Sequence, residues 1–128
     1  MSANLKTILY VEDDPDIQFV AEIALAQVGG FDLKVCSSGH EAISAAANMK
    51  PDLILLDVMM PEMDGPTTLG ELRKLDNTRN TPVIFMTAKV QAAEVSSYLA
   101  LGAIAVINKP FDPMSLAETV RKHWEQVA

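Results

Sequence analysis

The sequence predicts an α/β protein: a doubly wound, five-stranded parallel sheet with five helices. Short apolar runs of strand length alternate five times with longer amphipathic stretches of helical period. The apolar runs are continuous, which is typical of parallel strands buried on both faces. Strict strand–helix alternation places helices on both sides of the sheet through right-handed crossovers. The predicted strands are Thr7–Val11, Leu33–Cys36, Leu53–Leu56, Val83–Met86 and Ala103–Ile107.

The first helix is predicted to begin at Asp14-Pro15, where an acidic N-cap precedes a proline at the first helical position. Asp14 could instead be a third metal ligand, but the proline after it favours the capping role. Gly29-Gly30 ends the helix. Its apolar stripe has i, i+3, i+4 spacing and consists of Ile17, Val20, Ala21, Ala24, Leu25 and Val28.

The middle helices carry weaker start signals. Ser38-Gly39-His40-Glu41 has the spacing of a capping box for the second helix. The third helix opens near Gly65-Pro66 with Asp64 as its cap, and Gly70 weakens it. The fourth helix, about Val90 to Leu101, is predicted to end at Gly102.

The last helix is predicted to begin at Asp112-Pro113, which repeats the acid–proline signal of the first helix. Its apolar stripe consists of Leu116, Val120, Trp124 and Val127.

The 128 residues fit one domain, residues 1–128 with a core at about 6–124 and no output domain. The net charge is −7 and the basic residues are scattered, so we expect no direct contact with nucleic acid. The single cysteine, Cys36, excludes an internal disulfide and is predicted to be buried. No stretch is long and apolar enough for a membrane span, and the start lacks a secretory signal, so we expect no membrane contact and a cytoplasmic location.

Reactive side chains follow four of the five predicted strands. Glu12-Asp13-Asp14 follows the first strand, Asp57 the third, Thr87 the fourth and Asn108-Lys109-Pro110 the fifth. Ligands of open parallel sheets bind beyond the carboxyl ends of the strands, where the connecting loops gather. We therefore expect these side chains to meet at one edge of the sheet.

Carboxylates this close repel one another unless a cation lies between them. Mg²⁺ suits the set best, because it binds through one or two carboxylates and keeps places for water and phosphate. Lys109 can contact a phosphate oxygen and Asp57 together, and Thr87 can donate its hydroxyl to such an oxygen. The combination suits in-line phosphoryl transfer to Asp57, giving an aspartyl phosphate.

Four segments, which span nearly the whole chain from about Lys6 to Trp124, also resemble the marker segments of response-regulator receiver domains. The segments are ILYVEDD at 8–14, LLDVMMPEMDG at 55–65, PVIFMTA at 82–88 and KPF at 109–111. The resemblance implies a flavodoxin-like (βα)5 receiver fold with Asp57 as the phosphoacceptor. It implies that Asp13 binds Mg²⁺ directly, that Glu12 binds it directly or through water, and that the backbone carbonyl of Met59 is a further ligand.

The same resemblance implies that Thr87 and Lys109 contact the phosphoryl group and that the Lys109-Pro110 bond is cis. It implies a two-component switch that catalyses its own phosphorylation and dephosphorylation and is not a dedicated enzyme. The phosphodonor would be a sensor histidine kinase or a histidine phosphotransfer protein, and the output would be a downstream protein target.

Three positions depart from the usual family pattern. Val106 stands where many members carry a Tyr or Phe that rotates on activation, and Met59 and Lys89 occupy two variable positions beside the site. Because valine has one stiff torsion, it cannot sweep the volume of a rotating ring. We expect the signal to leave through the fourth helix instead, with Val95 and Tyr98 among the residues that face a partner.

Two other functions compete with this prediction. The chain could be an interaction module on a receiver fold that works without phosphorylation. It could also be an aspartate-nucleophile phosphatase, but enzymes of the haloacid-dehalogenase type carry a second acid two residues after the nucleophile, where this chain has Met59. A dinucleotide carrier fits the fold but not the residues, because no G-x-G-x-x-G follows the first strand.

Overall fold

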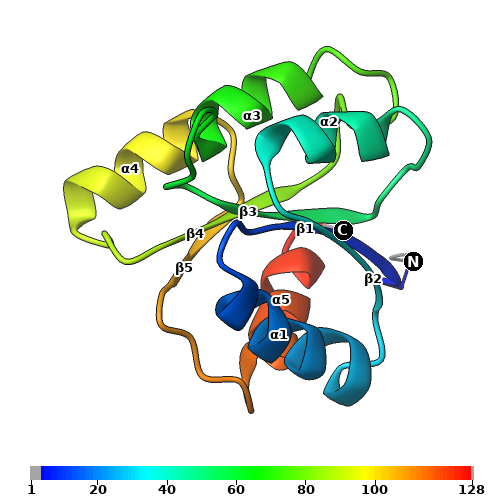
Figure 1. Cartoon of the computed structure of the whole chain (residues 1–128). Coiled ribbons are helices and arrows are strands. Elements are labelled where there is room, and N and C mark those ends of the chain that lie inside the picture. The colour runs from blue at the N-terminus through cyan, green and yellow to red at the C-terminus, as the bar shows by residue number, and fades with distance from the viewer. Residues whose placement is uncertain (1–3, 128) are drawn as a thin grey trace.

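The computed structural model describes residues 4–127 as one five-stranded sheet with helices on both faces (Figure 1). All strand pairs are parallel, and the strand order is β2-β1-β3-β4-β5. The fold class is therefore the predicted one. The strands are β1 (Thr7–Val11), β2 (Asp32–Cys36), β3 (Leu53–Asp57), β4 (Val83–Thr87) and β5 (Ala105–Asn108).

Helices α2, α3 and α4 cover one face of the sheet, and α1 and α5 cover the other (Figure 1). Their bounds are α1 (Pro15–Glu22) with a π-helical continuation η1 (Ile23–Val28), α2 (Gly39–Ala46), α3 (Gly65–Leu72), α4 (Ala92–Ala100) and α5 (Leu116–Glu125). Within the described part of the chain, no helix combines the length and apolar character that crossing a membrane needs.

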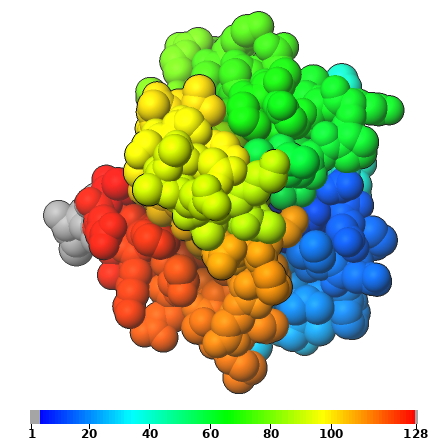
Figure 2. All heavy atoms as spheres, turned by 90° about the vertical axis from the view of Figure 1, so that its left-hand side faces the viewer, coloured from blue at the N-terminus to red at the C-terminus, as the bar shows by residue number. Residues whose placement is uncertain are grey.

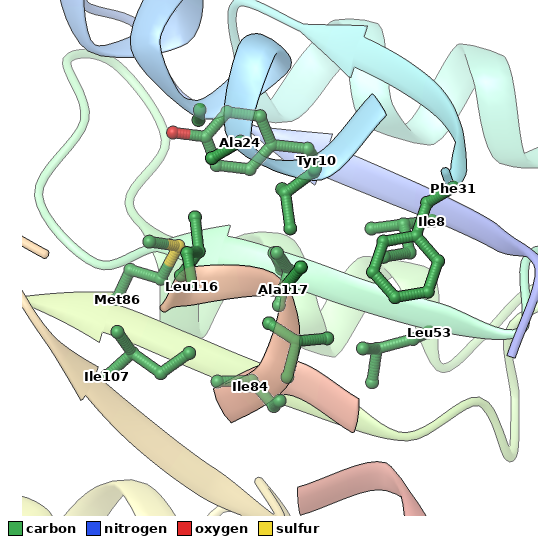
Figure 3. Packing of buried hydrophobic residues seen from close by; sticks show 14 of the residues in the cluster. Ile8, Tyr10, Ala24, Phe31, Leu53, Ile84, Met86, Ile107, Leu116 and Ala117 are labelled. Carbon is green, nitrogen blue, oxygen red and sulfur yellow. The ribbon is translucent and has the colours of Figure 1, made fainter. Parts of the chain in front are cut away.

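The side chains of the three inner strands, β1, β3 and β4, alternate between two apolar clusters, one on each face of the sheet. Ile8, Tyr10, Leu53 and Leu55 pack with residues of α1 and α5, as Figure 3 shows for part of this cluster. Leu9, Val11, Ile54 and Leu56 pack with residues of α2 and α3. The central strand β3 is buried along its whole length, including its last residue, Asp57. Trp124 and Cys36 are buried as predicted.

Side-chain caps start the first three helices. The carboxylate of Asp14 accepts from the backbone N–H groups of Asp16 (2.9 Å) and Ile17 (3.4 Å), and Pro15 is the first helical residue. Asp64 accepts from the N–H of Thr67 at 2.8 Å. Only half of the predicted capping box forms at α2. Ser38 Oγ accepts from the N–H of Glu41 (3.1 Å), but the Glu41 carboxylate accepts from the residue before Ser38.

The predicted start of the last helix is wrong by several residues. The Asp112 carboxylate accepts from the N–H of Met114 at 3.0 Å, and this local turn takes the place of a helical first turn. Helix α5 begins at Leu116 and has no side-chain cap at Ser115. Leu116, Val120 and Trp124 face the core as predicted, but Val127 lies beyond the end of the helix and is exposed.

The predicted stripe of the first helix is also partly wrong. Ala21, Ala24 and Leu25 are buried, whereas Val20 and Val28 are 38% and 59% exposed. Val20 lies at the edge of the stripe. Val28 lies in η1, where π-helical bonds of the i→i−5 type widen the backbone and turn the later residues away from their α-helical positions.

Helix α4 differs from the other helices in how loosely the fold holds it. None of its nine residues is buried. One of its attachments is Tyr98, whose ring packs against the Phe85 ring with centroids 5.4 Å apart. Gly102, with φ of 107°, then turns the chain back toward β5 in a conformation that disfavours other residues.

Candidate metal centre at the carboxyl edge of the sheet

The parallel sheet brings the predicted reactive residues to one edge. Glu12 follows β1, Asp57 and Thr87 are the last residues of β3 and β4, and Lys109 follows β5. Figure 2 views the side of the molecule on which the blue, green, yellow and orange parts of the chain, which carry these residues, meet. This convergence was predicted, because parallel strands end at the same edge.

Three carboxylates form the centre of the site. Oxygens of Glu12, Asp13 and Asp57 all lie within 4.8 Å of one another. In residues 4–127 no other group of three acidic, histidine or cysteine side chains has this spacing. Glu12 and Asp57 are almost fully buried, and Asp13 is partly exposed. The cluster can therefore offer carboxylate oxygens to a cation while one side stays open to solvent.

The ammonium group of Lys109 bridges two of these carboxylates. Its Nζ atom lies 2.7 Å from Glu12 Oε1 and 3.0 Å from Asp57 Oδ1, and the lysine side chain is 16% exposed. Both contacts are charge-assisted hydrogen bonds in a poorly hydrated setting, where such bonds are strong. Sequence reasoning predicted the contact with Asp57 but not the contact with Glu12.

The protonation of the site reflects burial first and charge second. Burial raises the pKa of Glu12 to about 7, although the hydrogen bond from Lys109 opposes this shift. Burial also raises the pKa of Asp57 against the opposing effect of Lys109. Burial alone would lower the pKa of Lys109, but its bonds to Glu12 and Asp57 outweigh this effect and raise it. The site therefore has more negative charge than one ammonium can stabilise.

This donor set fits Mg²⁺. The ion prefers hard oxygen ligands and is typically held by one or two carboxylates together with water and phosphate oxygens. The three carboxylates provide such oxygens, and a divalent cation between them would relieve the repulsion that the single ammonium leaves. Met59, whose backbone carbonyl is a predicted further ligand, has an exposed side chain, and the role of its carbonyl stays a prediction.

Thr87 is tied to Lys109 through the backbone. The Thr87 carbonyl accepts from the N–H of Lys109 at 2.9 Å, and its buried hydroxyl accepts from the N–H of Lys89 at 3.1 Å. The Lys109-Pro110 peptide bond is cis. A displacement of Thr87 would therefore also move Lys109 and the loop that leads into α4.

Two residues that support the site were missed by the sequence reasoning. The Gln18 amide donates to the backbone carbonyl of Glu12 and, at 3.0 Å, to Ser37 Oγ, so it ties the β1–α1 turn to the residue after β2. A Cβ atom on Gly65 would lie 2.4 Å from the Asp57 carbonyl oxygen. Gly65 is visible in the sequence as a helix start, but neither contact has a sequence signal, since each depends on the folded backbone.

The remaining predicted residues lie around the site. The Asp14 carboxylate is used for helix capping and is not in the metal-fitting cluster. Val106 on β5 is half-buried and pairs with Phe85 in the sheet register. Val95 and Tyr98 are half-buried on α4, and the Tyr98 ring faces Phe85 rather than only solvent.

Comparison with known proteins places this arrangement in a family. The profile of the response regulator receiver domain matches residues 8–121. The chain belongs to the response regulator receiver family. It is similar to the DNA-binding response regulator MtrA of Mycolicibacterium smegmatis (36% identity over 121 residues, 94% of this chain and 51% of that protein). It is also similar to the transcriptional regulator RpaA of Synechocystis (34% over 114 residues, 89% and 47%).

Solved receiver structures have the same fold. The chemotaxis response regulator CheY4 of Vibrio cholerae matches with a TM-score of 0.85 and 27% identity, covering 94% of this chain and 99% of that one. A receiver domain of a Pseudomonas aeruginosa sensor histidine kinase, solved with a magnesium ion coordinated in its active-site cleft, matches with a TM-score of 0.82 and 29% identity over 95% and 99%. The chain is thus a receiver domain, a signalling switch of two-component systems, and it spans about half the length of the curated relatives it matches.

Proposed function

We propose that this receiver domain accepts a phosphoryl group on Asp57 in a Mg²⁺-dependent reaction and signals by changing its contacts with other proteins. The observation that carries the proposal is the buried Asp57 carboxylate, which lies within 4.8 Å of two further carboxylates and 3.0 Å from the Lys109 ammonium. A structural ion pair would need one acid for one base. A site for a divalent cation needs this excess of carboxylates, and the bound cation would then offset the negative charge of an incoming phosphoryl group.

The reaction is an in-line displacement at phosphorus. A carboxylate oxygen of Asp57 forms the new O–P bond while the bond from phosphorus to the donor breaks, and the electron pair of that bond stays with the donor. Bound Mg²⁺ would neutralise charge on the phosphoryl oxygens. Glu12, Asp13, Asp57 and the Met59 carbonyl would hold the ion. Lys109 would turn its ammonium toward a phosphoryl oxygen, and the Thr87 hydroxyl would donate to another. On this proposal the domain catalyses its own phosphorylation and dephosphorylation.

Receiver domains pair with histidine kinases, so the donor proposed for this chain is a phosphohistidine of a sensor kinase or a histidine phosphotransfer protein. The output proposed is binding to a downstream protein. MtrA and RpaA are DNA-binding proteins, but this chain covers only about half of each, and we expect no direct nucleic-acid contact from residues 1–128. A single receiver domain over these residues and a cytoplasmic location stay predictions.

Intact-mass measurement after incubation with acetyl phosphate tests the proposal. The wild type should gain one phosphoryl group only when Mg²⁺ is present, and Asp57→Asn should gain none, because an amide is not a nucleophile toward phosphorus. Asp76→Asn, at an exposed surface ion pair with Arg79, is the matched control and should label like the wild type. Equal labelling of wild type and Asp57→Asn would remove Asp57 as acceptor. No labelling of either would favour the phosphorylation-independent module.

For the output we propose movement of α4. Thr87 and Phe85 lie on the same face of β4, and Phe85 contacts the α4 ring of Tyr98. If Thr87 moves toward the phosphoryl oxygens, β4 and its loop can shift a helix that has no buried residue to hold it. A shift of this kind needs a differential stabilisation of only about 5 kcal/mol.

Amide chemical shifts with Mg²⁺ and beryllofluoride, a phosphoryl analogue, test the output proposal. We expect changes along residues 90–101 in addition to the site loops. Tyr98→Ala should leave phosphorylation unchanged and should reduce the shift changes in α4 relative to those in the site. Changes restricted to the site loops would refute movement of α4 as the output.

A further inference from the structure

The hydroxyl group of Tyr10 presents a problem that the proposed function does not solve. Tyr10 is the residue before the last in β1, and its side chain is fully buried. Across residues 4–127 its hydroxyl is the one buried side-chain polar atom without a hydrogen-bond partner. A buried unpaired hydroxyl typically costs about 1–3 kcal/mol, so a native protein that keeps one needs a reason for it. Phenylalanine would fill the same space without this cost.

The sheet places Tyr10 directly beneath the acidic site. Successive side chains of a strand point to opposite faces, so Tyr10 and Glu12 point to the same face, one step apart. In the register Tyr10 lies beside Leu55, and Leu55 in turn lies one step below Asp57 on the same face. Of the two strand residues directly below these carboxylates, Tyr10 and Leu55, only Tyr10 has a polar side chain.

The phenol ring reaches toward the site rather than toward the opposite end of the sheet. In Figure 3 the Tyr10 oxygen points away from Ile8, Phe31 and Leu53, toward the end of the sheet at which Met86 lies. Met86 is the residue before Thr87, the last residue of β4. Burial, and after it the charges of Glu12, Asp57 and Asp14, raise the pKa of Tyr10. The hydroxyl keeps its proton and can act only as a neutral donor or acceptor.

The neighbouring carboxylate of Glu12 changes partners if the proposed function is correct. In this structure Oε1 of Glu12 accepts from Lys109 Nζ at 2.7 Å, and Oε2 accepts from the Asp14 N–H at 3.1 Å. A divalent cation among the three carboxylates would repel the ammonium, and a phosphoryl group on Asp57 would attract it. Either event would remove the Lys109 donor from Glu12. A carboxylate has about four acceptor positions, so the buried Glu12 side chain could bind the ion and still accept a further hydrogen bond.

We propose that Tyr10 is a positioning residue whose hydroxyl donates, directly or through one buried water, to the Glu12 carboxylate once the Lys109 ammonium leaves it. The inference rests on the proposed function, since it requires a Mg²⁺-bound or phosphorylated state. The hydroxyl would be unsatisfied in the cation-free state and satisfied in the Mg²⁺-bound state. The free-energy cost of the unpaired hydroxyl in the cation-free state would thus favour the Mg²⁺-bound state.

Tyr10→Phe tests the inference because it removes one oxygen atom and nothing else. Without Mg²⁺ the variant should melt at the same temperature as the wild type or higher. In a calorimetric titration its dissociation constant for Mg²⁺ should rise about three- to tenfold, the equivalent of one net hydrogen bond. The additional stabilisation by beryllofluoride with Mg²⁺ should fall as well. Tyr98→Phe, which removes the hydroxyl of the only other tyrosine, is the matched control and should change neither quantity.

The Tyr98→Phe background also gives a direct signal from the group itself. Tyr10 is then the one tyrosine left, so its ultraviolet difference spectrum on adding Mg²⁺ reports a new hydrogen bond at its hydroxyl. We expect a red shift of the tyrosine band that saturates with the Mg²⁺ titration.

Each outcome decides the question. If the wild type binds Mg²⁺ and Tyr10→Phe binds it equally well, only the role of Tyr10 fails. If the wild type shows no response to Mg²⁺ or beryllofluoride, the proposed function fails and this inference fails with it. If Tyr10→Phe is much less stable than the wild type without Mg²⁺, its hydroxyl is already satisfied in the cation-free state, and the inference is overturned.

Discussion

Replacement of Lys109 by methionine isolates the role of the ammonium that bridges Glu12 and Asp57. Methionine keeps most of the apolar length of lysine and removes the charge. Two almost fully buried carboxylates are then left without the cation that lies 2.7 and 3.0 Å away in the wild type. Their mutual repulsion and their lost hydration become uncompensated unless a proton or a metal ion takes the place of the ammonium.

The loss of stability in Lys109→Met should depend on pH. Removing one partner of a buried ion pair costs about 3–5 kcal/mol when the other charge stays ionised. At about pH 8 we expect Lys109→Met to lower the free energy of unfolding by about 3 kcal/mol, which corresponds to a fall in Tm of about 10 °C for a domain of this size. Burial holds the folded-state pKa of Glu12 and of Asp57 above the ordinary value, and loss of Lys109 raises both further. The folded variant therefore binds more protons than the unfolded chain, and its stability falls as pH rises. At about pH 5 the carboxylates can take up protons, and the loss should shrink to about 1 kcal/mol.

Thermal and urea unfolding at both pH values, with and without Mg²⁺, measure this difference. Saturating Mg²⁺ should restore most of the lost stability at the higher pH, because the metal takes over the neutralising role. Lys122→Met is the matched control: Lys122 lies 3.9 Å from Glu118 with both side chains more than 70% exposed, and its removal should cost less than about 0.5 kcal/mol at either pH. A loss at Lys109→Met that is equal at both pH values, or that Mg²⁺ does not reverse, would refute the electrostatic reasoning.

Two further predictions follow from the site. Gly65→Ala places a Cβ atom 2.4 Å from the Asp57 carbonyl oxygen and should destabilise the protein by about 2–4 kcal/mol in urea unfolding. Gly70→Ala is the control: its Cβ would have no atom within 4 Å, so it should be neutral or stabilise helix α3 by up to about 1 kcal/mol. Equal effects of the two substitutions would contradict the close approach at Gly65. Because the pKa of Glu12 is about 7, a proton competes with Mg²⁺ for this carboxylate below that pH. The Mg²⁺ dissociation constant measured by calorimetry should therefore rise by up to about tenfold per pH unit between about pH 7 and pH 6. A dissociation constant that stays unchanged over this range would remove Glu12 from the metal site.

The sequence predicts the sheet and its reactive edge well because both follow from simple periodicities. Continuous apolar runs mark strands buried on two faces, and parallel strands bring Glu12, Asp57 and Lys109 to one edge wherever they lie in the chain. The caps at Asp14 and Asp64 are local signals and could likewise be predicted.

The features that the sequence does not predict depend on contacts between distant residues or on small changes of backbone geometry. The π-helical turn of η1 has no composition that distinguishes it from an α-helix, so the exposure of Val28 could not be foreseen. Asp112 has the same acid–proline signal as Asp14, yet it closes a turn instead of capping a helix. The contact of Lys109 with Glu12 joins residues 97 positions apart, and no local pattern encodes it.

The two outer strands of the sheet restrict how this protein can recognise its partners. An unprotected edge strand invites an added strand from another chain. Here β2 exposes Asp32 and Lys34 along one edge, and β5, at the other edge, has only four residues. Charged and short edges both disfavour strand addition, a mode of binding that depends only weakly on side-chain sequence. We therefore expect a partner to contact side chains on the helices and loops, where differences in surface residues can distinguish one partner from another.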